Sequence, residues 1–428
     1  MLYSHQLQII NFVRSTPRAL CICPCGAGKT RAILEAFDRA FVIAPLRVAR
    51  LVWPEEAEAV GKRCGVIRGG VCGNPSAAFY VTNFENAAHL NDFIVPKTMN
   101  TLVIDESSKL KSFQFRQGGK RAKLLHAFAK RFDRIVLLTG TPCSESLGDL
   151  YSQISFLDDG ATFGRSKPKF MQRYHMNVSR SPKYPIWRPL PNAKDDVLKA
   201  CESFCRYFEP TIETFGSSVQ SVVYPLDSNQ KASLRRLKGT QLLEIGDAAC
   251  YACNRAVLAG RLLQAASGFY YAVDKRVIWE STARIDTLKE LLDEIGERCV
   301  VVAYWRASID AILSAVTNVT GDVLAFKNGA ARHLVINPAS AGHGLSLQRE
   351  SNHMILYEPF FSCEQYEQVV ERIGERRQAQ SGLNRVAYYH FIQSDVGPDR
   401  AAFQALRDKA DAEAAIIDYF RNLARSLK

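Results

Sequence analysis

Residues 21–30 read Cys-Ile-Cys-Pro-Cys-Gly-Ala-Gly-Lys-Thr, and this stretch decides the fold. An apolar run, residues 19–23, precedes the glycines, and a helix-like run, residues 31–40, follows the threonine. A strand, a glycine-containing turn and a Gly-Lys-Thr that opens a helix form the context of a phosphate-binding loop, or P-loop. The usual first glycine of that motif is Cys23 here, so an ordinary turn is the alternative. The order of the flanking elements favours the P-loop.

Each residue type in this loop suits contact with a nucleotide. The backbone N–H groups of the turn and of the helix N-terminus can hold phosphate oxygens. The Lys29 ammonium would reach the β- and γ-phosphates, and the Thr30 hydroxyl would bind Mg²⁺. The candidate nucleotide-binding residues of the loop are Cys25, Gly26, Ala27, Gly28, Lys29, Thr30 and Arg31.

Gln6 lies upstream of the loop, next to an apolar helical face. A glutamine placed here could bind the edge of an adenine, because its amide both donates and accepts hydrogen bonds. The alternative is a surface glutamine on a first helix.

A second motif carries the acids that a P-loop needs. Residues 101–106, Thr-Leu-Val-Ile-Asp-Glu, predict a buried strand that ends in two carboxylates, the Walker B pattern. Asp105 would hold Mg²⁺ through water, and Glu106 would orient and activate the attacking water. Residues 134–142 predict a further strand, after which Thr139 and Thr141 could bond to these acids and sense the γ-phosphate. Alternating strands and helices to this point predict a parallel, doubly wound sheet.

The chain is basic, with a formal net charge of +12 over 428 residues. A surplus of this sign favours a polyanionic partner but does not distinguish DNA from RNA. Arg47 and Arg50 follow the predicted strand 40–46 and could grip a phosphodiester or belong to a solvated face. The same two readings apply to the basic residues after the acids, which are Lys109, Lys111, Arg116, Lys120, Arg121 and Lys123.

Length and composition, 47% hydrophobic and 23% charged, predict two or three globular domains. We expect a nucleotide-binding lobe at 1–160, a partly helical insertion or linker at 161–280 and a second lobe at 281–428. No apolar run is long enough for a membrane span, and no signal peptide is predicted. We therefore expect a protein of the cytoplasm, either bacterial or of a phage-infected host.

The second half predicts another series of strands and helices, without a P-loop. A helical region is expected at 228–268 and a last amphipathic helix at 400–426. The other predicted helices are 284–296, 306–316 and the basic 365–380, and the predicted strands are 299–305, 322–326, 332–336, 353–357 and 385–392.

Twelve cysteines indicate free thiols in a reducing compartment. Cys201/Cys205 and Cys250/Cys253 could form a zinc site, but both pairs lie in stretches that predict helix. Buried thiols are the favoured interpretation.

The series of motifs resembles the superfamily 2 helicases and, within them, the Swi/Snf-like ATPases, especially small phage-type members. The stretches that carry the resemblance are 26–30, 105–108, 138–142, 338–347 and 368–378, with 2–6 similar to the adenine-sensing start of the family. The resemblance implies two RecA-like lobes with ATP in the cleft between them. It also implies that 342–347, including Gly344 as a nucleotide contact, couples nucleic acid to the nucleotide. Ser107-Ser108 replaces the family's Ala-His, so the coupling that the family makes through this His is absent here or is made by a hydroxyl.

The resemblance also implies an arginine that completes the site from the second lobe. Gln368 and Arg372 fit the family spacing, but the next position is Glu375, and Arg376 and Arg377 follow it. In a continuous helix, residues four apart share a face. We therefore predict that Arg372 and Arg376 face the γ-phosphate; the alternative is a solvated face with internal Glu–Arg pairs.

Together these features predict a nucleic-acid-stimulated ATPase, an ATP-dependent translocase or helicase with ATP and Mg²⁺ as cofactors. DNA is the expected nucleic acid, the core is expected to be monomeric, and replication or recombination proteins are candidate further partners. The alternatives are an RNA helicase of the same fold, a scaffold with an inactive ATPase core, and, more weakly, a nuclease.

Overall fold

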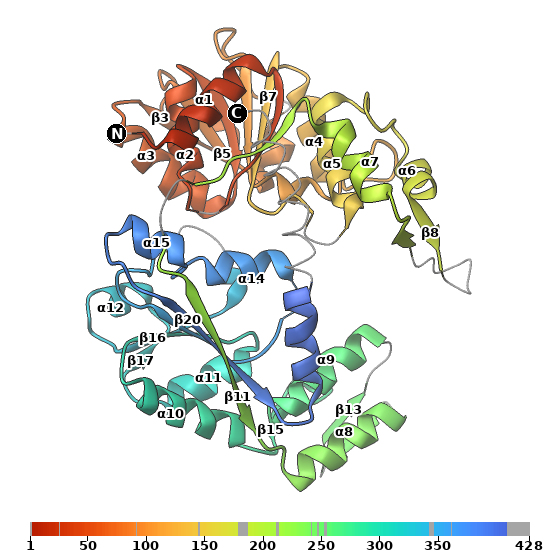
Figure 1. Cartoon of the computed structure of the whole chain (residues 1–428), viewed down its shortest axis with the longest axis vertical. Coiled ribbons are helices and arrows are strands. Elements are labelled where there is room, and N and C mark those ends of the chain that lie inside the picture. The colour runs from red at the N-terminus through yellow and green to blue at the C-terminus, as the bar shows by residue number, and fades with distance from the viewer. Residues whose placement is uncertain are drawn as a thin grey trace. The chain divides into compact units, whose positions relative to one another are not determined.

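The structure is a computed structural model that describes residues 2–408 except 25, 91, 144–145, 179–186, 211–213, 241, 246–247, 252–254, 342–345 and 361. The described chain forms two compact units (Figure 1). The first unit holds the described residues up to 210, and the second unit holds those from 214 to 408.

Among the described residues of the first unit, eight strands form one sheet in the order β10-β1-β7-β6-β2-β5-β3-β4. Neighbouring strands are parallel except for β4, which returns antiparallel to β3. The strands are β1 (Arg18–Ile22), β2 (Ala40–Ala44), β3 (Cys64–Arg68), β4 (Val71–Cys72), β5 (Phe79–Asn83), β6 (Thr101–Asp105), β7 (Arg134–Thr139) and β10 (Cys205–Tyr207). The carboxyl ends of β1, β7 and β6, which are neighbours, therefore meet at one edge of the sheet.

Helices cover both faces of this sheet, because alternate residues of its strands point to opposite sides. One face packs on α1 (Ser4–Ser15), α2 (Lys29–Ala36) and α3 (Trp53–Ala59), the last preceded by a π-helical turn, η1 (Val48–Val52). The other face packs on the 3₁₀ turns η2 (Phe84–His89) and η3 (Ser107–Leu110) and on α4 (Lys120–Ala129), α5 (Leu147–Asp158), α6 (Lys167–Tyr174) and α7 (Ala193–Cys201). A small ribbon, β8 (His175–Asn177) and β9 (Trp187–Pro189), joins α6 to α7.

In the second unit, the described strands form a six-stranded parallel sheet in the order β11-β20-β19-β16-β18-β17. The strands are β11 (Ser217–Tyr224), β16 (Cys299–Val302), β17 (Val319–Thr320), β18 (His333–Ile336), β19 (His353–Leu356) and β20 (Ala387–Ser394). The first strand, β11, pairs with the last, β20, over eight residues.

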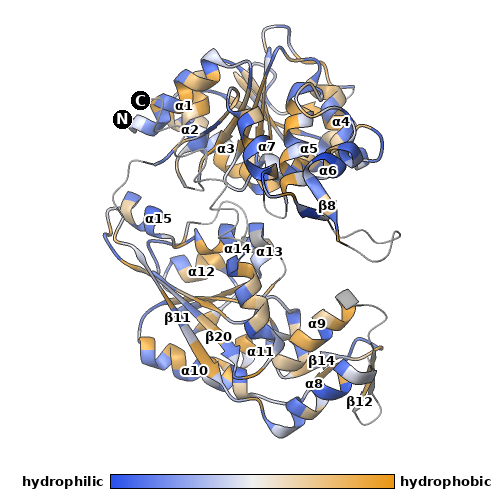
Figure 2. Cartoon of the chain, turned by 45° about the vertical axis from the view of Figure 1, so that its right-hand side comes forward, coloured by the Kyte–Doolittle hydropathy of each residue, from blue (hydrophilic) through white to orange (hydrophobic). Residues whose placement is uncertain are grey.

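Both faces of this sheet are also covered, and Figure 2 shows the strands of both units as mainly hydrophobic. One face packs on α8 (Ser228–Thr240), α9 (Arg255–Ala266), α10 (Ala283–Ile295) and α11 (Arg306–Ala315). The other packs on α12 (Val323–Lys327), α14 (Cys363–Val370) and a helical stretch at 398–408. The remaining elements are α13 (Pro338–Ala341), α15 (Glu375–Gln380) and two hairpins, β12 (Leu242–Ile245) with β13 (Ala248–Tyr251) and β14 (Phe269–Tyr271) with β15 (Val277–Trp279).

A buried ion pair lies beneath the second sheet. The Arg284 guanidinium bonds to the Asp399 carboxylate, and the two side chains are 1% and 0% exposed. The same guanidinium donates to Tyr224 Oη at 2.9 Å and to Ser267 Oγ at 3.0 Å. Arg284 thus connects α10 to the last residue of β11 and to residues that follow α9 and β20.

The predicted fold class, two mostly parallel sheets flanked by helices, is confirmed. The residues predicted as an insertion, 161–280, do not form a body of their own, because β10 completes the first sheet and β11 begins the second. The helical region predicted at 228–268 is two helices separated by a hairpin. Of the helix predicted at 400–426, residues after 408 lie outside the described chain. No helix in the described part is long and apolar enough to cross a membrane.

The strand predicted at 322–326 was wrong, since Val323–Lys327 is the helix α12. Its start is fixed by Asp322, whose carboxylate accepts the backbone N–H of Leu324 at 2.9 Å. An aspartate in this N-cap position favours a helix turn over the strand that Val, Leu and Phe suggest.

Candidate nucleotide-binding site

The predicted P-loop connects the end of β1 to the start of α2. Cys23 still pairs with β7, donating its N–H to Thr139 O at 2.9 Å, and α2 then begins at Lys29. Gly26 and Gly28 have left-handed backbones, with φ of 77° and 73°. The positive φ of Gly28 favours glycine, and a Cβ there would also lie 2.3 Å from Gln6 Nε2, so that the Gln6 side chain would have to move. Cys25 lies outside the described residues.

Two side chains of helix α1 contact backbone carbonyls of this loop. His5 Nε2 lies 2.9 Å from Ala27 O, and burial lowers the pKa of His5, so a neutral ring that donates to the carbonyl fits the site. Gln6 Nε2 donates to Gly28 O at 3.1 Å, while its Oε1 accepts the N–H of Tyr3 at 2.9 Å. Gln6 is therefore buried and bound to the loop, which differs from the surface glutamine considered above. Its contact with adenine stays a prediction.

Lys29 lies in the first turn of α2 and bends back over the loop. Its Nζ donates to Cys23 O at 2.8 Å, and its charge opposes the rise that burial causes in the pKa of Asp105. The ammonium is thus close to both the loop and the acidic motif, as a phosphate-binding lysine must be. Thr30 follows it and is half-buried, whereas Arg31 pairs with Glu35 on the same helix at 3.1 Å.

Asp105 ends β6 at the same edge of the sheet, and Trp53 holds one of its oxygens. The Trp53 indole is fully buried and donates Nε1–H to Asp105 Oδ2 at 3.0 Å. Burial raises the pKa of Asp105, while Lys29 and the Trp53 bond oppose that rise. Trp53 was not among the predicted residues. The available signal was the tryptophan N–H itself, which needs an acceptor when the ring is buried.

Glu106 has a left-handed backbone, with φ of 65° and ψ of 61°, although it is not glycine. Such a conformation costs free energy and often occurs at functional sites. Its Oε1 accepts hydrogen bonds from Ser108 Oγ at 2.9 Å and from Thr139 Oγ1 at 3.4 Å. The predicted bond from Thr139 to the acidic motif is therefore confirmed, and Ser108 supplies a hydroxyl at the departure from the family pattern.

Thr141 behaves differently from Thr139. Its backbone N–H donates to Thr139 Oγ1 at 3.0 Å, but its own Oγ1 is buried and has no hydrogen-bond partner among the described residues. The predicted bond from the Thr141 hydroxyl to the acids is thus not formed. A buried hydroxyl of this kind at the edge that carries Lys29 and Asp105 is suited to a polar ligand.

Ser107 connects the acidic motif to α5. Its Oγ donates to Gln153 Oε1 at 2.7 Å, and Gln153 Nε2 donates to Pro142 O at 2.6 Å. Gln153 is fully buried and joins the second and third motifs, a role that its position in an apolar helix did not reveal.

The arginine segment of the second unit is not one helix, so the predicted register was wrong. Helix α14 ends at Val370, and α15 begins at Glu375 after an extended Gly374 with ψ of 155°. Arg372 lies in the break and is 4% exposed, whereas Arg376 Nη1 pairs with Glu371 Oε1 at 3.2 Å. The argument that Arg372 and Arg376 share a helical face is therefore lost, and their role stays a prediction. Gly344 lies outside the described residues.

The residues of the first unit suit a nucleotide with Mg²⁺. A glycine turn, a helix N-terminus and an ammonium lie beside two carboxylates, and the Trp53 indole bonds to the Oδ2 atom of Asp105. Thr30 and Asp105 would hold the ion. The Thr141 hydroxyl, which has no hydrogen-bond partner among the described residues, could bond to an oxygen of the bound nucleotide or of a water molecule.

The described cysteines bear on the zinc alternative. Cys201, Cys205 and Cys250 are buried free thiols, and Cys253 lies outside the described residues. No group of three or more metal-binding side chains was found in the described part of the chain.

Comparison with known proteins gives one clear relative. Protein p41 of Acyrthosiphon pisum secondary endosymbiont phage 1 is 30% identical over 97% of both chains. No protein-family model matches the sequence. Among solved structures, the SWI2/SNF2 ATPase core of Sulfolobus solfataricus in complex with dsDNA aligns over 98% of this chain and 95% of that chain. The TM-score is 0.41 and the identity 16%, too low to assign a fold or a function.

Proposed function

The chain belongs to the same family as phage protein p41, and we propose that it is an ATPase that translocates along nucleic acid or separates its strands, with DNA as the polymer. The observation that carries the proposal is the meeting of Lys29, Asp105 and Glu106 at one edge of the first sheet. A glycine turn with two left-handed residues lies beside them. These are the parts that hold and hydrolyse a nucleoside triphosphate.

The chain's own residues divide the work of hydrolysis. Turn N–H groups and Lys29 bind the phosphates, and Lys29 offsets their charge. Glu106, held by Ser108 and Thr139, orients water and accepts its proton. Mg²⁺ would neutralise charge on the phosphate oxygens when bound.

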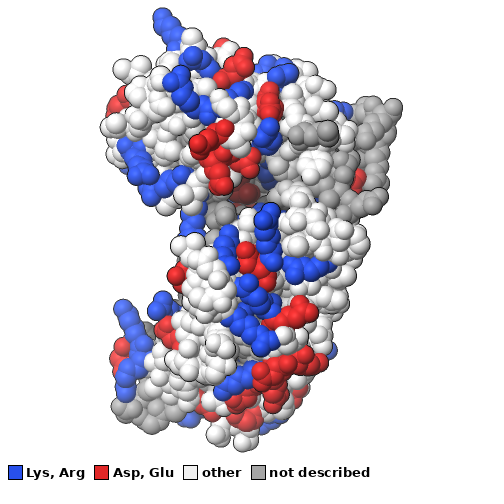
Figure 3. Space-filling view, turned by 90° about the vertical axis from the view of Figure 1, so that its left-hand side faces the viewer, with Lys and Arg blue, Asp and Glu red and all other residues white. Residues whose placement is uncertain are grey.

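A polyanionic partner is supported by the net charge of +12 and by its uneven distribution. Figure 3 shows basic side chains gathered over one part of the second unit and acidic ones over another. The acidic part includes α10, with Asp286, Glu290, Asp293 and Glu294 exposed, while Lys327, Arg332 and Arg349 are exposed basic residues. The surplus of positive charge over the whole chain favours binding to a phosphodiester backbone.

The first test is ATP turnover by the purified chain with duplex DNA, single-stranded DNA and RNA of one sequence. We expect stimulation that falls steeply with salt, because bound cations release counterions from the polymer. Stimulation by RNA alone would favour the RNA helicase alternative. No turnover under any condition would reject the proposal in favour of a scaffold.

Two variants make that test specific to this site. Lys29→Ala should remove turnover, because the β/γ-phosphate charge is left uncompensated. Glu106→Gln should keep Mg·ATP binding and lower kcat by roughly 10²–10⁴-fold, since the amide is a poor base. A matched control is Glu58→Gln, which removes an exposed carboxylate from α3, outside the loop and the acidic motif. A kcat equal to that of the parent in both variants would show that Lys29 and Glu106 take no part in hydrolysis.

A further inference from the structure

Two segments far apart in the sequence form a basic pocket in the first unit. Residues 114–117 follow the acidic motif, and residues 163–169 lead into α6. Together they line a pocket of about 510 Å³. Its polar lining consists mainly of Gln114, Arg116, Gln117, Arg165, Lys167 and Lys169.

The lining carries four cationic side chains and no carboxylate. Two of the four are tied down: Lys167 Nζ donates to Ser152 Oγ at 3.3 Å, and Arg165 pairs with Asp159 just outside the pocket. Arg165 also lies over the Phe115 ring, 5.2 Å from its centre. Arg116 and Lys169 are exposed to solvent. Three of the four cations, Arg116, Arg165 and Lys169, are therefore exposed, and Lys167 is half-buried.

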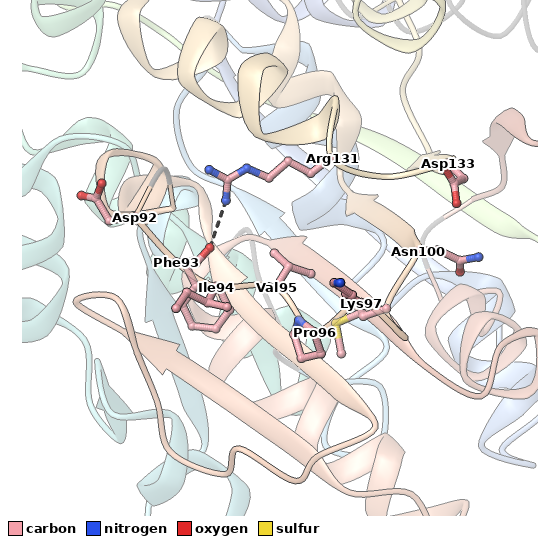
Figure 4. A pocket seen from close by; sticks show the side chains of 10 residues that line it. Asp92, Phe93, Ile94, Val95, Pro96, Lys97, Asn100, Arg131 and Asp133 are labelled. Atoms are coloured by element: carbon pink, nitrogen blue, oxygen red, sulfur yellow. Dashed lines mark hydrogen bonds between the residues drawn. The ribbon is translucent and has the colours of Figure 1, made fainter.

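A second pocket of the same unit is a useful contrast. It measures about 500 Å³ and lies before β6 and β7, at the edge of the sheet opposite the P-loop (Figure 4). Asp92 and Asp133 line it together with Lys97 and Arg131. The Arg131 guanidinium is committed to Phe93 O at 2.9 Å, the bond drawn in Figure 4. Its mixed charges disfavour a polyanion, so size alone does not distinguish the two pockets.

We propose that the basic pocket binds backbone phosphates of the nucleic acid, an inference that rests on the proposed function. Apart from Arg165, which pairs with Asp159, the cations of the lining have no carboxylate among the other lining residues, and such cations bind phosphodiesters without reading sequence, which a translocase requires. The two glutamines can donate hydrogen bonds to phosphate oxygens or sugar hydroxyls.

The pocket is connected to the nucleotide site through neighbouring residues of α5. Ser152 accepts from Lys167 of the pocket and donates to Lys111 O at 2.9 Å. Gln153, the next residue, binds Ser107 of the acidic motif. Two hydrogen bonds, Lys167 to Ser152 and Gln153 to Ser107, therefore connect a nucleic-acid strand bound at Lys167 to the residue that follows Glu106. Through them, binding of the polymer could affect hydrolysis.

The experiment measures binding of the full chain to labelled duplex DNA by fluorescence anisotropy, across a series of KCl concentrations. The test variant is the double substitution Arg116→Gln with Lys169→Gln. The control, Arg63→Gln with Lys97→Gln, removes the same charge from exposed residues that precede β3 and β6. We expect the slope of log K against log[KCl] to lose about two units in the test variant, close to 0.9 for each phosphate contact, and none in the control.

Other outcomes overturn this inference separately from the proposed function. If the parent binds no polymer at low salt, the proposed function itself fails. If the parent binds and the test variant keeps its slope, or if both variants lose equal slope, the pocket is not the phosphate site. Displacement of the DNA by equimolar pyrophosphate would identify a small-phosphate site instead. Because both test residues are exposed, we expect the double substitution to leave the thermal unfolding midpoint unchanged. If the midpoint falls, the single variant Lys169→Gln is measured in its place.

Discussion

Single residues show where sequence reasoning succeeds and where it stops. Lys29, Asp105 and Glu106 could be predicted because the P-loop and Walker B patterns keep their chemistry within a few neighbouring positions. Trp53 could not, since its bond to Asp105 crosses 52 positions and exists only once β2, η1 and β6 have packed. The left-handed backbone of Glu106 also lay beyond the sequence, because only tertiary contacts hold a non-glycine residue there.

Trp53→Phe tests whether the indole N–H positions Asp105. Without that bond the pKa of Asp105 rises further, so the acid limb of the kcat–pH profile should move to higher pH. Apparent Mg²⁺ affinity should weaken by about 10–100-fold, as is typical when a partner that orients a metal ligand is lost. Both are read from ATP turnover over pH and Mg²⁺ titrations.

The control for this substitution is Trp305→Phe. Trp305 Nε1 is buried and has no hydrogen-bond partner in the described part of the chain, so its loss should leave both titrations unchanged. Equal shifts in the two variants, or none at Trp53, would mean that the indole serves only packing.

Helices and strands were predicted correctly where the hydrophobic pattern was long. The prediction failed where a single residue determines where a helix ends. The central strands of both sheets were found because each is a buried apolar run. The helix predicted at 365–380 is broken instead, because Gly374 takes an extended backbone that starts α15 anew. Any residue can adopt the φ of −54° found there, but a Cβ at this position would lie 3.2 Å from Glu371 Cα, and no local sequence pattern predicts that close approach.

Because the helix is broken at Gly374, the three arginines have different surroundings and can be tested separately. We expect Arg372→Ala and Arg376→Ala to lower kcat by roughly 10³–10⁵-fold with saturating nucleic acid and confirmed ATP binding, as loss of an arginine finger does. Arg377→Ala is the comparison, because Arg377 Nη1 reaches Ser346 Oγ at 3.4 Å. A large loss at Arg377 alone would assign the role to that residue.

Arg376 needs one more variant, since its ion pair gives a structural explanation for any loss. Burial raises the pKa of Glu371, and Arg376 opposes that rise. Glu371→Gln combined with Arg376→Ala removes the buried charge along with its partner. If kcat recovers in the double variant, Arg376 only neutralises Glu371; a continuing loss supports a role in hydrolysis.

At the scale of the molecule, two units could be predicted, but the position of the division could not. Residues 161–280 have weak periodicity, and only strand pairing shows that β10 belongs to the first sheet and β11 to the second. The buried Arg284–Asp399 pair was likewise hidden, because it joins residues 115 positions apart.

Arg284→Met should therefore destabilise the second unit by about 3–5 kcal/mol, because it leaves the Asp399 carboxylate buried without its partner. Arg306→Met is the control: Arg306 pairs with Asp310 on an exposed face, where such a pair contributes about 0–1 kcal/mol. Urea unfolding followed by hydrogen exchange of peptides from α10 and α11 measures both. Equal effects would show that Arg284 contributes no more than a surface charge.

The pairing of β11 with β20 sets an order of events during protein synthesis. Every described strand of the first sheet has been synthesised once residue 207 is made, so that sheet can form early. Strand β11 follows at once but has no neighbour until β20, about 170 residues later, has been translated. A nascent chain arrested between these strands would thus carry a finished first sheet beside an unpaired strand edge. Such an edge is prone to mispairing with other strands, and we expect a chaperone to bind the nascent chain at this stage.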